Sequence, residues 1–206
     1  MKLVKEVCVE SFDEAVRAVG AGATRIELCE NLGCGGTTPS YGTIKRCMEK
    51  LGVPVMVMIR PRGGDFVYSE DEFAIMQEDI TRCRELEVSG VVFGILTREG
   101  NIDLQRTRKL VQLSQPLQVT FHKAIDVSNN LPDGVTALKE MGVGRILTSG
   151  GQKTALEGRA MLLQMIELAA PKISIIVAGK VTFENFEEVR NQIPACEFHG
   201  RKLVDF

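Results

Sequence analysis

The sequence predicts an α/β fold of the (β/α)8 class, the TIM barrel, in which eight parallel strands alternate with helices and close on themselves. Two observations lead to this prediction. Eight strand-like segments with seven intervening helix-like segments follow one another, at a spacing of roughly 20–35 residues. The links are short, and neither a linker nor a low-complexity tract divides the chain. A doubly wound open sheet is the alternative, but sequential units with short links favour closure, so we expect one domain over residues 1–206.

In the first half of the chain, residues 3–10 and 55–60 alternate with the period of two that is typical of strands. The expected strands are residues 3–10, 25–29, 53–59 and 90–95. Serine and glutamate three residues apart, as in the capping boxes at 11–14 and 69–72, predict where two of the helices begin. The expected helices are residues 12–19, 41–51, 70–86 and 103–114.

The second half repeats the same unit. The expected strands are residues 116–122, 145–149, 173–178 and 196–200, with helices at 132–141, after a third capping box at 154–157, and at 182–192. Thr182 is the expected N-cap of the last helix.

We expect no helix after the eighth strand. The groove between the last and first strands is then covered either by a partner subunit in a homo-oligomer or by the tail, residues 201–206.

Composition narrows the classes of function. The chain is 44% hydrophobic and 25% charged, with a formal net charge of −2, which argues against nucleic acid or an anionic membrane as a partner. It has neither a run of about 20 apolar residues nor the apolar core of a signal peptide, so we expect a cytoplasmic protein. In a reducing compartment its six cysteines are expected as thiols.

The stretch 60–66, Arg-Pro-Arg-Gly-Gly-Asp-Phe, follows the third strand and is the most distinctive segment of the chain. Pro61 ends the strand because it has no N–H to donate. Arg60 therefore stands at the end of a buried strand, followed by a glycine turn that carries Arg62 and Asp65. This arrangement is typical of a ligand site. The alternative is an arginine–aspartate pair that only rigidifies the turn.

Strand alternation also predicts which side chains point into the barrel. The ionisable residues expected inside are Glu6, Arg25, Glu27, Arg60, His122, Glu197 and His199. The fourth, sixth and seventh strands give no clear assignment. Because a barrel interior is normally filled by branched aliphatic residues, so many buried charges indicate a functional cavity.

One chemistry that fits this interior is soft-metal binding. Cys8 and Cys29 end consecutive strands, which lie about 4.8 Å apart when paired. Met56 and Met58 are one strand further on, and thiolates and thioethers together select Cu(I). Cys34, in the next loop, is a possible third thiolate. The alternative is that these residues only fill the core.

The other chemistry is acid–base catalysis on a small phosphorylated or carboxylated metabolite. His122 stands at the carboxyl end of the fifth strand, where barrels keep catalytic residues, and near neutrality it is suited to move a proton. Glu27 and Glu197 are candidates to orient it. Arg60 and Arg62 are candidates to hold an anion through paired hydrogen bonds.

Further candidates for substrate binding are Asp65, His199 and two glycine turns. Ser149-Gly150 and Gly179 follow the sixth and seventh strands, and backbone N–H groups in such turns bind phosphate. Lys123 suggests a Schiff base, but strict alternation points it out of the barrel.

The motifs taken together resemble the CutC family, which is named for copper homeostasis. The resemblance covers residues 6–199. Its motifs are Glu6-Val-Cys8, Arg25-Ile-Glu-Leu-Cys29, Gly35-Gly-Thr-Thr-Pro-Ser40, Met58-Ile-Arg-Pro-Arg-Gly-Gly-Asp-Phe66, Thr120-Phe-His122, Arg145-Ile-Leu-Thr-Ser-Gly150 and Glu197-Phe-His199. The resemblance implies a TIM barrel, a cytoplasmic location, a homo-oligomer and a link to copper. It places Cys8 and Cys29 at the family's two candidate copper cysteines.

Two interpretations follow. The first is a cytosolic copper-homeostasis protein that binds Cu(I) through Cys8 and Cys29. The second is a lyase or isomerase in which His122 is the acid or base and the arginines hold an anionic substrate.

Overall fold

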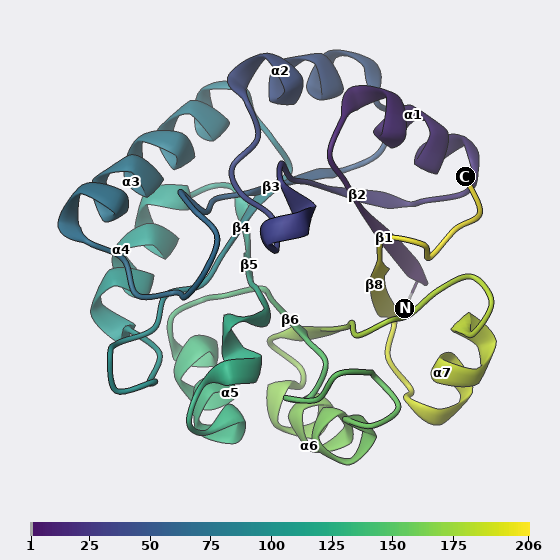
Figure 1. Cartoon of the computed structure of the whole chain (residues 1–206). Coiled ribbons are helices and arrows are strands. Elements are labelled where there is room, and N and C mark those ends of the chain that lie inside the picture. The colour runs from purple at the N-terminus through teal and green to yellow at the C-terminus, as the bar shows by residue number, and fades with distance from the viewer. Residues whose placement is uncertain (1) are drawn as a thin grey trace.

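The computed structural model describes residues 2–206 and shows a closed barrel of eight parallel strands (Figure 1). The strands are β1 Val4–Val9, β2 Arg25–Leu28, β3 Val55–Met58, β4 Gly90–Phe93, β5 Gln118–Phe121, β6 Arg145–Thr148, β7 Ser174–Val177 and β8 Glu197–Gly200. Each strand pairs with the next along the chain, and β8 closes the ring by pairing with β1, with Glu6 opposite His199. The (β/α)8 prediction is confirmed.

Within residues 2–206, seven helices lie outside the barrel, one after each of the first seven strands (Figure 1). They are α1 Phe12–Gly20, α2 Tyr41–Lys50, α3 Glu70–Glu85, α4 Leu104–Ser114, α5 Leu131–Glu140, α6 Arg159–Ala169 and α7 Phe186–Gln192, and two short 3-10 helices are η1 Leu32–Cys34 and η2 Lys123–Val127. Ser69 and Glu72 form both hydrogen bonds of a capping box at the start of α3, as predicted.

Two helices begin later than predicted. Thr154 and Glu157 form their reciprocal hydrogen bonds, 3.2 Å each, but these close a turn, and α6 begins only at Arg159. Thr182 is not the N-cap of α7, which begins at Phe186. The side chain of Asn185 instead accepts a hydrogen bond from the Thr182 N–H, at 2.8 Å, and stabilises a turn. The turn after β7 therefore does not open directly onto a helix.

The sheet separates one large outer apolar region from two small inner ones. The larger one lies between strands and helices and includes the fully buried Val57, Phe121 and Phe198. The smaller ones lie inside the barrel and consist of Cys29, Met56, Met58 and Val92 on one side and Leu147, Ile176 and Ala178 on the other. Alternation therefore assigned the faces of β1, β2, β3, β5 and β8 correctly. In β4, β6 and β7, for which alternation gave no clear assignment, the inward side chains include Val92, Leu147 and Ile176.

The chain after β8 forms a short irregular tail that packs beside α1 (Figure 1). Leu203 and Val204 are buried in the main core. Arg201 pairs with Glu10 at 3.0 Å, and the guanidinium of Arg17 lies over the ring of Phe206. The sequence predicts that a partner subunit or the tail covers the groove between β8 and β1. In the structure, the tail covers it.

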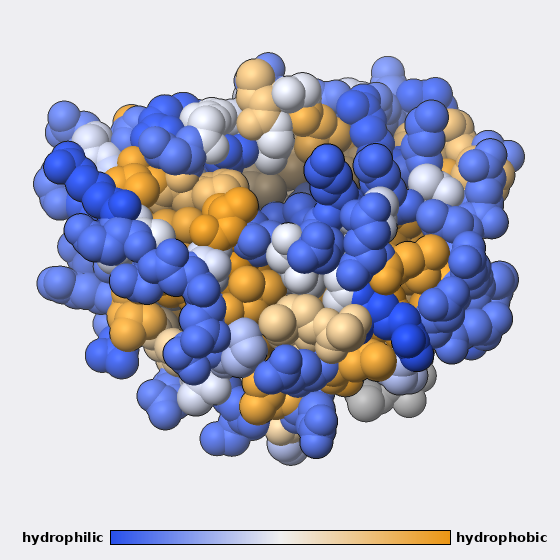
Figure 2. Space-filling view, turned by 60° about the horizontal axis from the view of Figure 1, so that its bottom comes forward, coloured by the Kyte–Doolittle hydropathy of each residue, from blue (hydrophilic) through white to orange (hydrophobic). Residues whose placement is uncertain are grey.

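On the face shown in Figure 2, apolar residues form patches among hydrophilic ones. Within residues 2–206, no helix is both long enough and apolar enough to cross a bilayer. The homo-oligomer stays a prediction.

Candidate functional site

The amino end of the barrel interior is closed by a chain of ion pairs. The guanidinium of Arg25, on β2, bridges Glu6 on β1 and Glu197 on β8. Glu197 also accepts from Arg145 Nε, at 3.2 Å. Burial by itself would raise the pKa of Glu6, but Arg25 and His199 outweigh burial and lower it to about 2. Glu197 thus lies with two arginines at the start of the strands, and its contacts are to them rather than to His122.

Above this layer, three strands bring together a thiol, a carboxyl and an imidazole. Cys8 on β1 stands beside Glu27 on β2, and His199 comes from β8 on the other side of β1. One potential metal-ligand atom from each lies within 4.8 Å of the others. His199 Nδ1 donates to Glu6 at 2.9 Å, and its Nε2 is 3.7 Å from Glu27.

The protonation of this group is set by burial and by the close charges. Burial raises the pKa of Glu27, and His199 lowers it only in part. Burial would lower the pKa of His199, but Glu27 and Cys8 raise it well above its usual value. The imidazole is therefore expected to be charged near neutral pH.

Cys29 and Met58 form a sulfur-rich wall next to this group. A Cβ built on Gly36 would lie 3.5 Å from Cys29 Sγ and 3.6 Å from Met58 Cε, so the loop after β2 closes onto both side chains. Burial and then Glu27 raise the pKa of Cys29 well above its usual value. Met56 lies deeper, against Gly90, and Cys34 is exposed on η1.

Both groups open onto one cavity of about 150 Å³ at the carboxyl end of the strands. Its lining includes Cys8, Glu27, Cys29, Met58, His122, Lys123 and His199. The structure therefore brings together both predicted metal cysteines and both histidines, at the end of the barrel where TIM-barrel enzymes keep their sites.

His122 is held as a neutral imidazole. Its Nδ1 accepts from the Ala124 N–H at 3.2 Å, and the ring packs 5.0 Å from that of Phe66. A Cβ on Gly94 would lie 2.5 Å from Nδ1, so that position has to be glycine for the ring to fit. Burial, followed by the charge of Arg60, lowers the pKa of His122 to about 3. Its Nε2 is buried without a hydrogen-bond partner among the residues described.

The two arginines after β3 are engaged by the loops around them. Arg60 donates to the carbonyls of Cys34 and Gly36, at 3.1 Å each, and to that of Gly64 at 2.7 Å. It therefore ties the loop after β2 to the loop after β3. Arg62 pairs with Asp65 at 3.0 Å and with Glu72 at 2.5 Å. Both guanidinium groups thus have protein acceptors where the sequence suggested a substrate anion.

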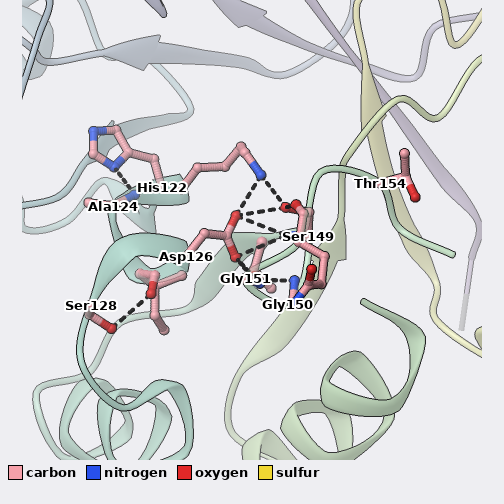
Figure 3. Close-up of polar contacts among 12 residues, drawn as sticks. His122, Ala124, Asp126, Ser128, Ser149, Gly150, Gly151 and Thr154 are labelled. Atoms are coloured by element: carbon pink, nitrogen blue, oxygen red, sulfur yellow. Dashed lines mark hydrogen bonds and ion pairs between the residues drawn. The ribbon is translucent and has the colours of Figure 1, made fainter. Parts of the chain in front are cut away.

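The glycine turn after β6 surrounds a carboxylate of the protein itself (Figure 3). Asp126 accepts hydrogen bonds from the N–H of Ser149 at 3.0 Å, from the N–H of Gly151 at 2.9 Å and from the hydroxyl of Thr148. The N–H of Gly150 donates to the Thr148 hydroxyl at 2.9 Å. Asp126 therefore occupies the position that the sequence suggested for a phosphate.

Gly179, in the turn after β7, has a packing role. A Cβ there would lie 2.7 Å from the Cβ of Ser149, and its carbonyl accepts from the Ala155 N–H at 2.9 Å. The glycine allows the two turns to pack against each other.

The prediction that Lys123 points out of the barrel is wrong. Strand β5 ends at Phe121, so alternation no longer applies to Lys123 at the start of η2. Its ammonium group contacts Asp126 and Ser149, and its side chain lines the cavity. The sequence reasoning missed Asp126. The sequence signal that could identify it is an acidic residue shortly after β5, combined with the glycine turn that follows β6.

The comparisons with known proteins agree with one another. The model of the CutC family matches residues 3–204. The chain is 42% identical, over 97% of its length and 78% of the relative's, to a Mesorhizobium japonicum protein named "family protein CutC". It is 43% identical, over 94% of its length and 71% of the relative's, to the mouse "Copper homeostasis protein cutC homolog".

Solved structures show the same likeness. The crystal structure of a CutC protein from Streptococcus agalactiae superposes with a TM-score of 0.93 at 37% identity, covering 98% of this chain and 100% of that one. A monomeric dihydrodipicolinate synthase variant superposes with a TM-score of 0.69 at 10% identity, over 97% of this chain and 69% of that one, and shares the fold alone.

We expect Asp126→Ala to lower the free energy of unfolding by about 2–4 kcal/mol, because it leaves the donors of Ser149, Gly151 and Thr148 without their acceptor. Urea denaturation measures the change. Asp71→Ala, at an exposed position in α3, is the matched control and is expected to change stability by less than about 0.5 kcal/mol. Equal effects of the two substitutions would contradict the role given to Asp126.

His122 is expected to make stability depend on pH. The unfolded chain takes up a proton at this histidine below about pH 6.5, whereas the folded protein does so only near pH 3. The contribution of His122 is therefore fully present above pH 6.5. It is lost as the pH falls from 6.5 toward 3, at up to about 1.4 kcal/mol per pH unit.

Urea denaturation of the wild type and of His122→Gln between pH 7 and pH 4 measures this contribution. We expect the variant to lose stability less steeply as the pH falls. Parallel pH profiles would show that His122 titrates normally in the folded protein.

Proposed function

The chain belongs to the CutC family, and we propose that it serves copper homeostasis in the cytosol by binding Cu(I) through Cys8 and Cys29. The observation that carries this proposal is that both thiols are buried and line one cavity together with the thioether of Met58. The names of the mouse and human relatives as copper homeostasis proteins support it.

The donor chemistry fits Cu(I). Thiolates and thioethers are soft ligands, and Cu(I) is the soft ion that such a set selects. Cys8 is on β1 and Cys29 directly follows the paired strand β2, two residues beyond the residue opposite Cys8. Met58, on β3, adds a weaker donor close to Cys29.

A positive charge beside Cys8 offsets the charge of a copper dithiolate, and metal binding displaces the proton that burial and Glu27 hold on Cys29. A single Cu(I) between two thiolates carries a net charge of −1, which is unfavourable in a buried position unless a cation lies nearby. The imidazole of His199, whose pKa is raised by Glu27 and Cys8, supplies that cation beside Cys8.

A second candidate function, a lyase or isomerase, rests on His122 and Glu27. The same cavity holds a neutral imidazole with an unpartnered Nε2 and a carboxyl group of raised pKa, which are suited to polarise a carbonyl and to move a proton. A carboxylated substrate fits this candidate better than a phosphorylated one, because the turn N–H groups after β6 already bind Asp126.

Competitive titration of the reduced protein with Cu(I) against a chromogenic chelator tests the proposal. We expect one equivalent to bind the wild type and the affinity to fall more than about 100-fold in Cys8→Ser/Cys29→Ser, because both thiolate ligands are lost. Cys196→Ser, at a partly buried position outside the cavity, is the control and is expected to bind as the wild type does. Equal affinity in the wild type and the double variant would overturn the copper proposal.

The same titration with His122→Gln separates the two functions. Copper binding requires no contribution from His122, so its loss leaves the affinity for Cu(I) unchanged. A lyase or isomerase loses turnover in this variant whatever its affinity for copper.

A further inference from the structure

We propose that Cys8, Glu27 and His199 form a second metal site, for a divalent cation of the zinc class, which shares Cys8 with the proposed copper site. The three side chains come from β1, β2 and β8, which are consecutive around the barrel. One ligand atom from each already lies within 4.8 Å of the others, and His199 Nε2 is 3.7 Å from Glu27 Oε2. In a tetrahedral zinc site the ligand atoms are separated by roughly 3.3–3.8 Å, so small rotations of these side chains are enough to close it.

Glu6 and Arg25 hold His199 in the orientation that a metal-binding histidine needs. His199 Nδ1 donates to the carboxylate of Glu6 at 2.9 Å, which leaves Nε2 directed toward Cys8 and Glu27. Glu6 is in turn fixed by the guanidinium of Arg25. A carboxylate that holds the far nitrogen of a histidine is a recurrent feature of metal sites, because it fixes the ring and increases its basicity as a ligand.

An unsatisfied atom also indicates a missing cation. Glu27 is 3% exposed, and its Oε1 is buried without a hydrogen-bond partner among the residues described. A buried carboxylate oxygen is normally paired with a donor or a cation, and one without either calls for an explanation. A cation between Glu27, Cys8 and His199 supplies the partner.

The donor set distinguishes this site from the copper site. One thiolate, one imidazole and one carboxylate are the mixed ligands that zinc accepts, whereas Cu(I) prefers sulfur. The charges also differ, because a divalent cation is neutralised by the thiolate of Cys8 and the carboxylate of Glu27. Three protein ligands leave a fourth position open toward the cavity, where Lys123 and His122 form part of the wall.

Without a metal, the same residues form a hydrogen-bonded cluster in which a charged His199 lies between Glu6 and Glu27. This alternative needs no cation, and the experiment below separates it from the proposal. The proposal does not require that Cu(I) binds. The two metals share Cys8 but differ in every other ligand.

Titration of the reduced, metal-free protein with Co²⁺ tests the site. Co²⁺ replaces zinc in such sites and reports a bound thiolate by charge-transfer absorption in the near ultraviolet and tetrahedral geometry by its visible bands. We expect both signals in the wild type, and we expect Zn²⁺ to displace them. Cys8→Ser is expected to remove the charge-transfer band.

Glu27→Gln keeps the size of the side chain, and His199→Gln keeps a polar group that can donate to Glu6. Each is expected to weaken Co²⁺ binding by about 100-fold or more, because it removes a ligand. Circular dichroism confirms that each variant is folded before it is titrated. Cys34→Ser, at an exposed thiol, is the control and is expected to leave the spectrum unchanged.

Cys29→Ser separates this proposal from the copper proposal. It removes a proposed Cu(I) ligand and no Co²⁺ ligand, so we expect it to abolish tight Cu(I) binding while the cobalt spectrum persists. His199→Gln is expected to abolish the cobalt signals while both proposed Cu(I) ligands stay in place. The absence of a charge-transfer band in folded wild type overturns the second site, as does a band that survives in both Glu27→Gln and His199→Gln. Neither result affects the copper proposal, which fails only if Cu(I) binding is independent of Cys8 and Cys29.

Discussion

The arrangement of the barrel depends on how its buried charges are paired. A closed eight-stranded barrel has room for side chains and little water, so each ionised group inside needs a partner of opposite charge. Arg25 meets this requirement by bridging Glu6 and Glu197, and Arg145 completes the chain of ion pairs. With Glu6 ionised and fixed, His199 is held above it and turned toward Cys8 and Glu27. The ion pairs at the amino end therefore support the donors at the carboxyl end.

The loops at the carboxyl end of the barrel are held in place by two side chains, Arg60 and Asp126. The sequence predicts a substrate-binding role for Arg60, but in the structure it binds the loops. Arg60 joins the loops after β2 and β3 through three carbonyls, and Asp126 joins η2 to the turn after β6. Such contacts hold the cavity wall in one geometry before any ligand enters. A preorganised wall suits a metal site, because ligand positions have to be correct within a fraction of an ångström.

Much of this arrangement could be predicted from the sequence, because within a strand the alternation of side chains is a geometric necessity. That is why Glu6, Cys8, Glu27 and His199 were placed inside the barrel. Three strands gave no assignment because their residues are apolar on both faces. Alternation failed two residues past the end of β5, where Lys123 follows the geometry of η2. The acceptors of Arg60 and the donors to Asp126 are backbone groups of distant loops, and no local sequence pattern encodes such contacts.

X-ray absorption spectroscopy of the Cu(I)-loaded protein tests the central claim most directly, because it identifies the atoms bound to the metal. The account predicts two sulfur neighbours in the wild type, and their loss from the copper shell in Cys8→Ser/Cys29→Ser. A first shell made only of nitrogen and oxygen, or one unchanged in the double variant, would contradict it.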